Sequence, residues 1–154
     1  MSGSKAKLKA ELLIALEAQL AAARSAHEAA VAGATHEEAK AENDKDTRGL
    51  EQSYLARGHA QRVGELENAV AVTQVFAPRA FGESDAIALG ALIDIEEDGK
   101  AKKLWLAPFG GGVELVGGIT VVTPTSPLGT ALLGKRVDDD VELGKRVLTV
   151  NGIE

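Results

Sequence analysis

Several absences limit what this chain of 154 residues can do. It contains no cysteine, which excludes disulfides, thiolate metal sites and cysteine nucleophiles. Aromatic residues make up only 3% of the chain, so a large aromatic-lined ligand pocket is not expected. No apolar run is long enough to span a bilayer, and the basic start leads into no signal-peptide core. We therefore expect a cytoplasmic protein that makes no membrane contact.

Proline is also absent before Pro78, and residues 5–75 consist largely of strong helix formers. Apolar and small residues recur there at alternating steps of three and four, the spacing of a coiled-coil seam. Two arms of this kind joined by a short connection predict an antiparallel helical hairpin. The seam positions are Leu13, Leu16, Leu20, Ala23, His27 and Ala30 in the first arm, and Ala56, His59, Val63, Leu66, Val70 and Thr73 in the second.

The connection between the arms is predicted within Gly33–Thr47. Gly33 can end the first helix, and Thr35 has capping-box spacing to Glu38, which predicts a short helical turn. The second arm can be capped by any of three residues in this segment, and the sequence does not choose between them. These are Asn43, Asp44 and Asp46.

A linker with Pro78, Gly82 and Ser84 follows the hairpin, and the hydrophobic period then changes to that of strands. The fold class is therefore α+β, with a long antiparallel coiled-coil hairpin over residues 1–77 and a small, mostly antiparallel sheet domain with one short helix over 78–154. The predicted strands are Ala86–Ile95, Lys103–Phe109, Val113–Val116, Ile119–Thr123, Asp140–Leu143 and Arg146–Val150, with a hairpin turn at Glu97–Lys100.

The short helix is predicted over Pro127–Gly134. Pro124 and Pro127 stop the preceding strand, because proline cannot donate to a sheet ladder. Ser126 can cap the helix, with Pro127 at its first position, and Gly134 can close it in the left-handed conformation.

Acidic residues gather at the predicted end of the hairpin, and they allow two interpretations. Carboxylates this close together can hold a divalent cation through oxygen ligands, and such a metal can assist displacement at phosphorus. They can also simply cap helices and keep a loop soluble, and spacing alone favours this interpretation. The residues are Glu37, Glu38, Glu42, Asp44 and Asp46.

Basic residues on and near the second arm are a second candidate site, because they could guide the 3′ end of a nucleic acid by phosphate contact. The alternative is a solvated helix face with pairs such as Arg62 to Glu65. The net charge is −6, so any contact with nucleic acid must be local rather than a basic surface. The residues are Lys45, Arg48, Arg57 and Arg62, and the histidines lack the partners of a zinc site.

The run Ser126-Pro-Leu-Gly-Thr-Ala-Leu-Leu-Gly-Lys135 resembles the C-terminal signature of the bacterial Gre transcript-cleavage factors. Gln74–Phe76 and Arg62–Glu67 resemble the end of that family's hairpin, so the similarity extends over nearly the whole chain. The resemblance implies an FKBP-like C-terminal domain without isomerase activity. This domain would dock at the rim of the RNA polymerase secondary channel, through Ser126, Pro127, Leu128 and Gly129.

The resemblance also implies that the hairpin enters the channel and that its acids help to hold the second active-site Mg²⁺ while the polymerase cleaves backtracked RNA. Glu42, Asp44 and Asp46 would be the acids facing the active site, and Asp44 and Asp46 would share the Mg²⁺. Lys45, Arg48 and Arg57 would contact the nascent RNA 3′ end or the polymerase. The protein would be a monomer associated with transcription elongation and DNA binding, with no cofactor bound alone and no enzymatic activity of its own.

The tip departs from the family pattern, in which an Asp and a Glu lie three residues apart. Counting back from Arg62 places Glu42 on that Asp and Lys45 on that Glu. Aligning the shared Glu42-Asn43 pair instead places Lys45 on a later Glu of the family motif, so either register replaces one family acid by lysine. Two functions within the family therefore stay open: stimulation of cleavage, and regulation or inhibition of the polymerase without cleavage. Two others are an FKBP-like prolyl isomerase, for which the sheet domain past Phe81 offers only Trp105 and Phe109 as aromatic walls, and a coiled-coil interaction module that dimerises.

Overall fold

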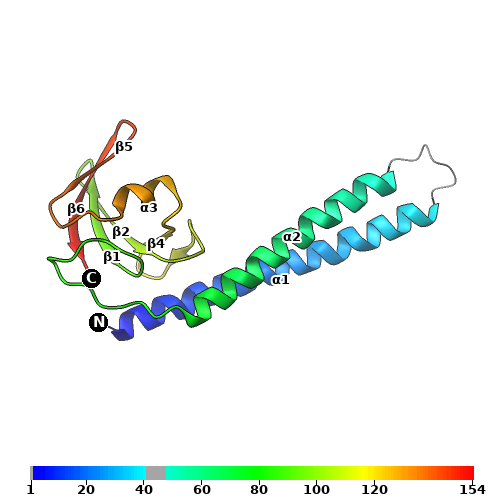
Figure 1. The fold of residues 1–154 in the computed structure, drawn as a ribbon, viewed down its shortest axis with the longest axis horizontal. Coiled ribbons are helices and arrows are strands. Elements are labelled where there is room, and N and C mark those ends of the chain that lie inside the picture. Colours follow the sequence, from blue (N-terminus) through cyan, green and yellow to red (C-terminus); the bar gives the residue numbers. More distant parts are fainter. Residues whose placement is uncertain (1, 41–47) are drawn as a thin grey trace. The chain divides into compact units, whose positions relative to one another are not determined.

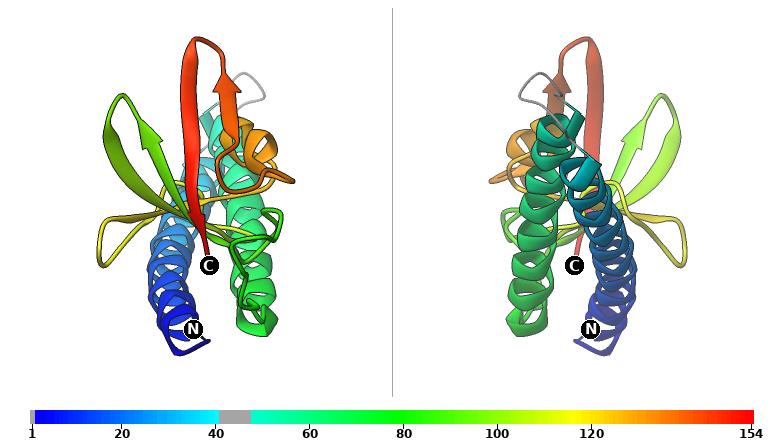
Figure 2. Two further views of the ribbon diagram at one scale, coloured as in Figure 1. Left: turned by 90° about the vertical axis from the view of Figure 1, so that its left-hand side faces the viewer. Right: turned by 90° about the vertical axis from the view of Figure 1, so that its right-hand side faces the viewer.

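The computed structural model describes residues 2–40 and 48–154, and Figure 1 labels its elements. Two long helices, α1 (Ser2–Lys40) and α2 (Arg48–Val75), lie side by side and run in opposite directions (Figures 1 and 2), which confirms the predicted helical hairpin. Gly33 does not end the first helix, because the surrounding alanine-rich sequence favours helix and Ala34 is buried at 7% exposure. The candidate caps Asn43, Asp44 and Asp46 lie outside the described residues.

The chain packs as two compact units. One consists of Met1–Ile14 together with Val72–Glu154, and the other is Ala15–Ala71. The first unit thus contains the beginning of α1 and the end of α2 in addition to the sheet. None of the described helices is both long and apolar enough to cross a membrane.

Within the helical unit, burial follows the predicted seam. Leu16, Leu20 and Leu66 are buried, and the smaller seam residues between them are half-buried. Side chains also meet across the seam: Arg24 lies 4.0 Å from the carboxylate of Glu67, and Arg62 donates to Gln19 at 3.5 Å. Arg62 also pairs with Glu65 at 3.8 Å, as its spacing on the helix predicts.

The other unit is built on a six-stranded sheet with the order β3-β4-β2-β1-β6-β5. Only β2 and β4 pair in parallel, and the other neighbours are antiparallel, so the mostly antiparallel sheet is confirmed. The hairpins β1–β2 and β5–β6 project at the edge of the view in Figure 2. The strands are β1 (Leu92–Glu97), β2 (Lys100–Leu106), β3 (Glu114–Leu115), β4 (Ile119–Val122), β5 (Asp140–Leu143) and β6 (Arg146–Ile153).

The first strand begins later than the sequence predicts. Ala91 N–H donates to the carbonyl of Ala88, and Gly90 has a φ of +97°, so residues 86–91 turn rather than extend. The hairpin turn is where the sequence places it. Asp98 and Gly99 both have positive φ, 52° and 76°, as a tight two-residue hairpin turn requires.

The sheet is buried on both faces. The core on the side of α3 (Pro127–Leu132) gathers alternate strand residues with Leu132 of the helix. On the opposite face Trp105 is fully buried, its indole N–H donates to the carbonyl of Gly90 at 3.2 Å, and the Phe76 ring lies 6.0 Å from its own. Core residues facing α3 include Ile93, Ile95, Leu104, Leu106, Val122, Val141, Leu148 and Val150.

Candidate functional site

The turn that leads into α3 is held by the side chain of Ser126. Its hydroxyl accepts from the backbone N–H of Gly129 at 3.0 Å and donates to the carbonyl of Thr123 at 2.8 Å. The backbone of Ser126 is extended, Pro127 is at the first helical position, and Gly134 has a φ of +81°. The predicted N-cap, first helical residue and left-handed C-terminal glycine of this helix are therefore confirmed.

Gly129 is required here for steric reasons. A Cβ on this residue would lie 1.8 Å from the carbonyl oxygen of Thr123, far inside any real contact distance. Ser126 and Gly129 thus shape the turn itself, whereas Pro127 is exposed and Leu128 is half-buried against the core. Of the predicted docking residues, Pro127 offers the most surface to a partner.

A shallow groove of about 560 Å³ runs beside this turn. Ser126 and Leu128 lie in its wall, so the structure brings half of the predicted docking residues to one groove. Leu133 was not predicted, although it is 40% exposed at the end of α3. The sequence could have indicated this exposure, because successive residues of a helix point in different directions, so burial of Leu132 turns the next leucine away from the core. The other lining residues are Gly111, Gly112, Thr120, Val121, Val122 and Thr123.

The predicted acidic tip lies outside the described residues, and this applies to Glu42, Asp44, Asp46 and also Lys45. Arg48 is the first residue of α2. Within residues 2–40 and 48–154, no group of three or more acidic or histidine side chains could hold a metal ion. The proposed metal-binding role of the tip therefore stays a prediction.

The exposed face of α2 carries large apolar side chains that the sequence analysis did not single out. Leu50, Tyr54 and Leu55 are 57%, 61% and 53% exposed. The sequence could have indicated that these side chains are exposed, because positions 50, 54 and 55 fall outside the seam register set by Ala56 and His59. The guanidinium of Arg57, one of the predicted contact residues, lies 5.5 Å from the centre of the Tyr54 ring.

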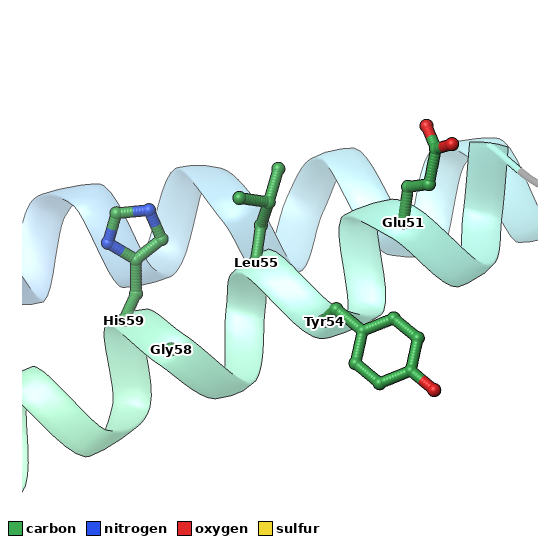
Figure 3. Close-up of a pocket in the computed structure, with 5 residues that line it drawn as sticks. All are labelled: Glu51, Tyr54, Leu55, Gly58 and His59. Carbon is green, nitrogen blue, oxygen red and sulfur yellow. The ribbon is translucent and has the colours of Figure 1, made fainter.

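An open groove of about 630 Å³ lies on this face of α2 (Figure 3). Tyr54 points to one side of the helix, while Glu51, Leu55 and His59 form a row on the other. Gly58 lies between the two sides and has no atom within 4 Å of the place where a Cβ would be. The missing side chain opens the groove.

The strongest described ion pair belongs to the sheet rather than to either candidate surface. Arg146 on β6 binds both carboxylate oxygens of Glu97 on β1, at 2.6 and 2.8 Å, and Lys102 lies 3.4 Å from the same carboxylate. Hydrogen bonding from Arg146 is the main cause that lowers the pKa of Glu97 to about 2. This pair links β1 and β6 beyond the last residues that pair in their ladder.

An isomerase-type pocket with aromatic walls is not found in the described parts of the chain. Trp105 is fully buried against the sheet, so it lines no cavity. The groove beside α3 contains no aromatic residue. The structure therefore gives no support to prolyl isomerisation.

No family model matches the chain. Among curated proteins, the transcription elongation factor GreA of Sphingopyxis alaskensis is 34% identical over 82 residues, which are 53% of this chain and 49% of that protein. The match thus spans about half the length of the curated relative. It confirms the resemblance to the Gre-type transcription elongation factors.

Solved structures of Gre homologues also align with the chain. GreA factor homolog 1 (Gfh1) of Thermus thermophilus covers 92% of this chain and 94% of its own, with 24% identity and a TM-score of 0.40. Gfh1 of Thermus aquaticus covers 90% and 91%, with 22% identity and a TM-score of 0.39.

Proposed function

We propose that this chain is a Gre-type factor that binds RNA polymerase and places its helical hairpin in the secondary channel. The match to a GreA protein carries the proposal. The packed seam of α1 and α2 and the capped turn before α3 support it, because each is a structural element that the family resemblance requires.

In this proposal the sheet unit docks through the exposed parts of the α3 turn, chiefly Pro127 and Leu133. The tip carboxylates of Glu42, Asp44 and Asp46 would supply oxygen ligands to a Mg²⁺ shared with the polymerase active site. Such a metal activates water and steadies an in-line displacement at phosphorus, which is the chemistry of transcript cleavage.

A second function within the family is regulation of the polymerase without cleavage. It is favoured by the lysine at position 45, because either alignment of the tip exchanges a family carboxylate for an ammonium group. A positive charge there would compete with a metal ion for the same negative surroundings rather than help to bind it.

Stalled, backtracked polymerase complexes distinguish the two functions. With the wild-type chain at saturating binding, shortening of the RNA supports the cleavage proposal, and its loss in the variant E42Q/D44N/D46N assigns the effect to the tip. A Lys45→Glu variant is the matched control, since it restores the family's charge pattern and should increase cleavage. Binding without any shortening by the wild type would identify a non-cleaving regulator.

Docking is tested separately by capture of polymerase. Leu133→Glu should weaken capture, because it places a charge on the exposed end of α3. Val147→Glu is a matched control, since Val147 is a similarly exposed residue on β6, at 52%. Equal capture by both variants would contradict docking through α3, and no capture by the wild type would contradict the proposed function as a whole.

A further inference from the structure

Strand β5 forms one edge of the sheet (Figure 1). Among the strands that the structure describes, β6 is its only neighbour. No loop covers the other side of β5 either, because no backbone hydrogen bond from the described parts of the chain reaches residues 140–143 from outside the sheet. An open edge of this kind can accept an extended segment of another chain as one more strand.

The hydrogen bonds between β5 and β6 show which backbone groups point outward. Val150 of β6 donates to the carbonyl of Asp139 at 2.9 Å. Because antiparallel strands exchange hydrogen bonds at alternate residues, Val141 is the next residue of the segment that bonds to β6. The residues on either side of Val141 therefore direct their N–H and C=O groups away from the sheet. These residues are Asp140 and Glu142.

The side chains of β5 alternate between the two faces of the sheet. Val141 is buried on the face that α3 covers, whereas Asp140 and Glu142 are exposed on the opposite face. A groove of about 310 Å³ lies beside the strand, and its lining includes these three residues together with Ala131 of α3 and Lys135. The edge thus has room for a side chain of an added strand.

The two acids at this edge have no cation beside them. On β1, by contrast, the carboxylate of Glu97 pairs with Arg146 at 2.6 Å. None of the ion pairs in the described parts of the chain includes Asp140 or Glu142. Asp140 accepts a hydrogen bond from the uncharged hydroxyl of Thr149, at 2.9 Å. The negative charge of the edge is therefore left for a partner to match.

We propose that β5 binds an extended segment of a basic partner protein as an added antiparallel strand, with Lys or Arg at alternate positions. Each basic side chain lies opposite Asp140 or Glu142, since directly opposite residues of antiparallel strands share a face of the sheet. The residue between them faces the side of α3, where an apolar side chain can enter the groove next to Ala131.

Two other occupants do not fit this edge. In a second copy of this chain, an antiparallel pair of β5 strands would place acid opposite acid, which is destabilising. A nucleic acid would bring its phosphates against the same carboxylates. The proposed contact is separate from the docking of polymerase through α3, so the test uses no polymerase and either proposal can fail without the other.

The probe is the acetylated and amidated peptide Lys-Val-Lys-Val-Lys, titrated into the ¹⁵N-labelled full chain. Amide hydrogen exchange then reports on single N–H groups. The N–H groups of Asp140 and Glu142 should shift during the titration and exchange with solvent more slowly in the complex. The N–H group of Val141, which already bonds within the sheet, should keep its exchange rate.

Two N-methylated peptides separate strand pairing from charge attraction. A methyl group on the backbone nitrogen of the central lysine removes a donor that faces β5, and it should weaken binding by about tenfold. A methyl group on the backbone nitrogen of one valine points away from β5 and should leave binding unchanged, because the donors of a strand alternate in direction. Both peptides carry the same charge as the parent peptide.

A pair of variants tests the place of the contact. Glu142→Gln should weaken binding of the parent peptide by about 1.4- to 5-fold, the usual effect of one exposed ion pair. Glu114→Gln is the matched control, since Glu114 is an exposed acid on β3, at the opposite edge of the sheet. This variant has the same net charge as Glu142→Gln and should bind like the wild type.

Three results would overturn the inference. Equal binding of the peptide methylated on lysine would reveal a charge contact without strand pairing. Unchanged exchange at Asp140 and Glu142 in the complex would place the peptide elsewhere on the protein. Absence of binding at millimolar peptide would mean that the two acids serve only to keep the edge from pairing with other strands.

Discussion

At the scale of single residues, glycine has opposite consequences in two helices of this chain. Gly129 in α3 has the carbonyl of Thr123 where a side chain would be, whereas Gly64 in α2 faces open space. Neither has a φ in the left-handed region, so the difference is one of space alone. The same substitution should therefore change stability in opposite directions at the two sites.

Gly129→Ala should destabilise the sheet unit by about 3 kcal/mol, because the turn must shift to relieve the overlap. Gly64→Ala should stabilise α2 by about 0.5–1 kcal/mol, since alanine lowers the conformational entropy of the unfolded chain. Urea unfolding followed by tryptophan fluorescence and circular dichroism measures both changes. A neutral Gly129→Ala variant would contradict the tight fit of the turn.

Lys5 is the most deeply buried charged residue among those described, at 2% exposure. Its ammonium group donates to the carbonyls of Arg79 and Glu154 at 2.7 and 2.6 Å, and it lies 4.8 Å from the centre of the Phe81 ring. Burial is the main cause that lowers the pKa of Lys5 below 10.5. One side chain thus joins α1, the linker and Glu154, the residue that follows β6.

Lys5→Met should destabilise the sheet unit by about 1–3 kcal/mol, because both carbonyls lose their donor. Lys9→Met is the matched control one turn later. Lys9 also binds a backbone carbonyl, that of Gln74 at 2.6 Å, but at an exposed site, so its loss should cost less than about 1 kcal/mol. If Lys5→Met were as stable as the wild type, desolvation of the ammonium group would outweigh its hydrogen bonds.

At the scale of elements, the sheet contains a pH-sensitive link between β1 and β6. The pKa of Glu97 is lowered from 4.5 to about 2, so the folded state favours the charged carboxylate. The stabilisation from this group is therefore fully present above pH 4.5 and is lost as the pH falls towards 2. Its partner Arg146 stays charged throughout this range.

The free energy of unfolding of the wild type and of Glu97→Gln should differ at neutral pH and converge as the pH falls below about 3. Urea unfolding at several pH values measures the difference. Glu96→Gln serves as the control, because the carboxylate of Glu96 accepts a hydrogen bond from the uncharged side chain of Asn151 at 3.3 Å, and this variant should show no such convergence. A constant difference between wild type and Glu97→Gln would mean that the ion pair does not control the acid response.

An element could be predicted from the sequence where neighbouring residues all favour the same local structure. The cap of α3 is one, because Ser126, Pro127 and Gly134 each act through backbone neighbours within a few residues. Gly33 could not be predicted, because its signal to end the helix competes with the propensity of its neighbours and the packing of Ala34. The pairing of Glu97 with Arg146 depends on strand register across 49 residues, which no local pattern contains.

At the scale of the whole molecule, some features of the candidate site could be predicted from the sequence and others could not. Helix register predicts which faces of α2 and α3 are exposed, although the exposure of Tyr54 and Leu133 was not among the predictions. The steric role of Gly129 depends on how the chain folds back on Thr123, and no local sequence pattern predicts that approach. Likewise, the sheet unit includes residues 1–14, which are far from its strands in the sequence.

A fragment of residues 76–154 should therefore be less stable than the same unit in the full chain. Leu8 and Leu12 are buried within that unit, and Leu12 approaches Gly110 so closely that a Cβ there would lie 2.5 Å from it. Removing these contacts exposes apolar surface, and each buried leucine contributes about 1.5–3 kcal/mol. The fragment should unfold at a lower urea concentration and bind the dye ANS. A fragment of residues 1–14 supplied as a peptide should restore part of the loss, whereas a Leu8→Asp/Leu12→Asp peptide should not. Equal stability of fragment and full chain would show that the sheet folds independently of α1.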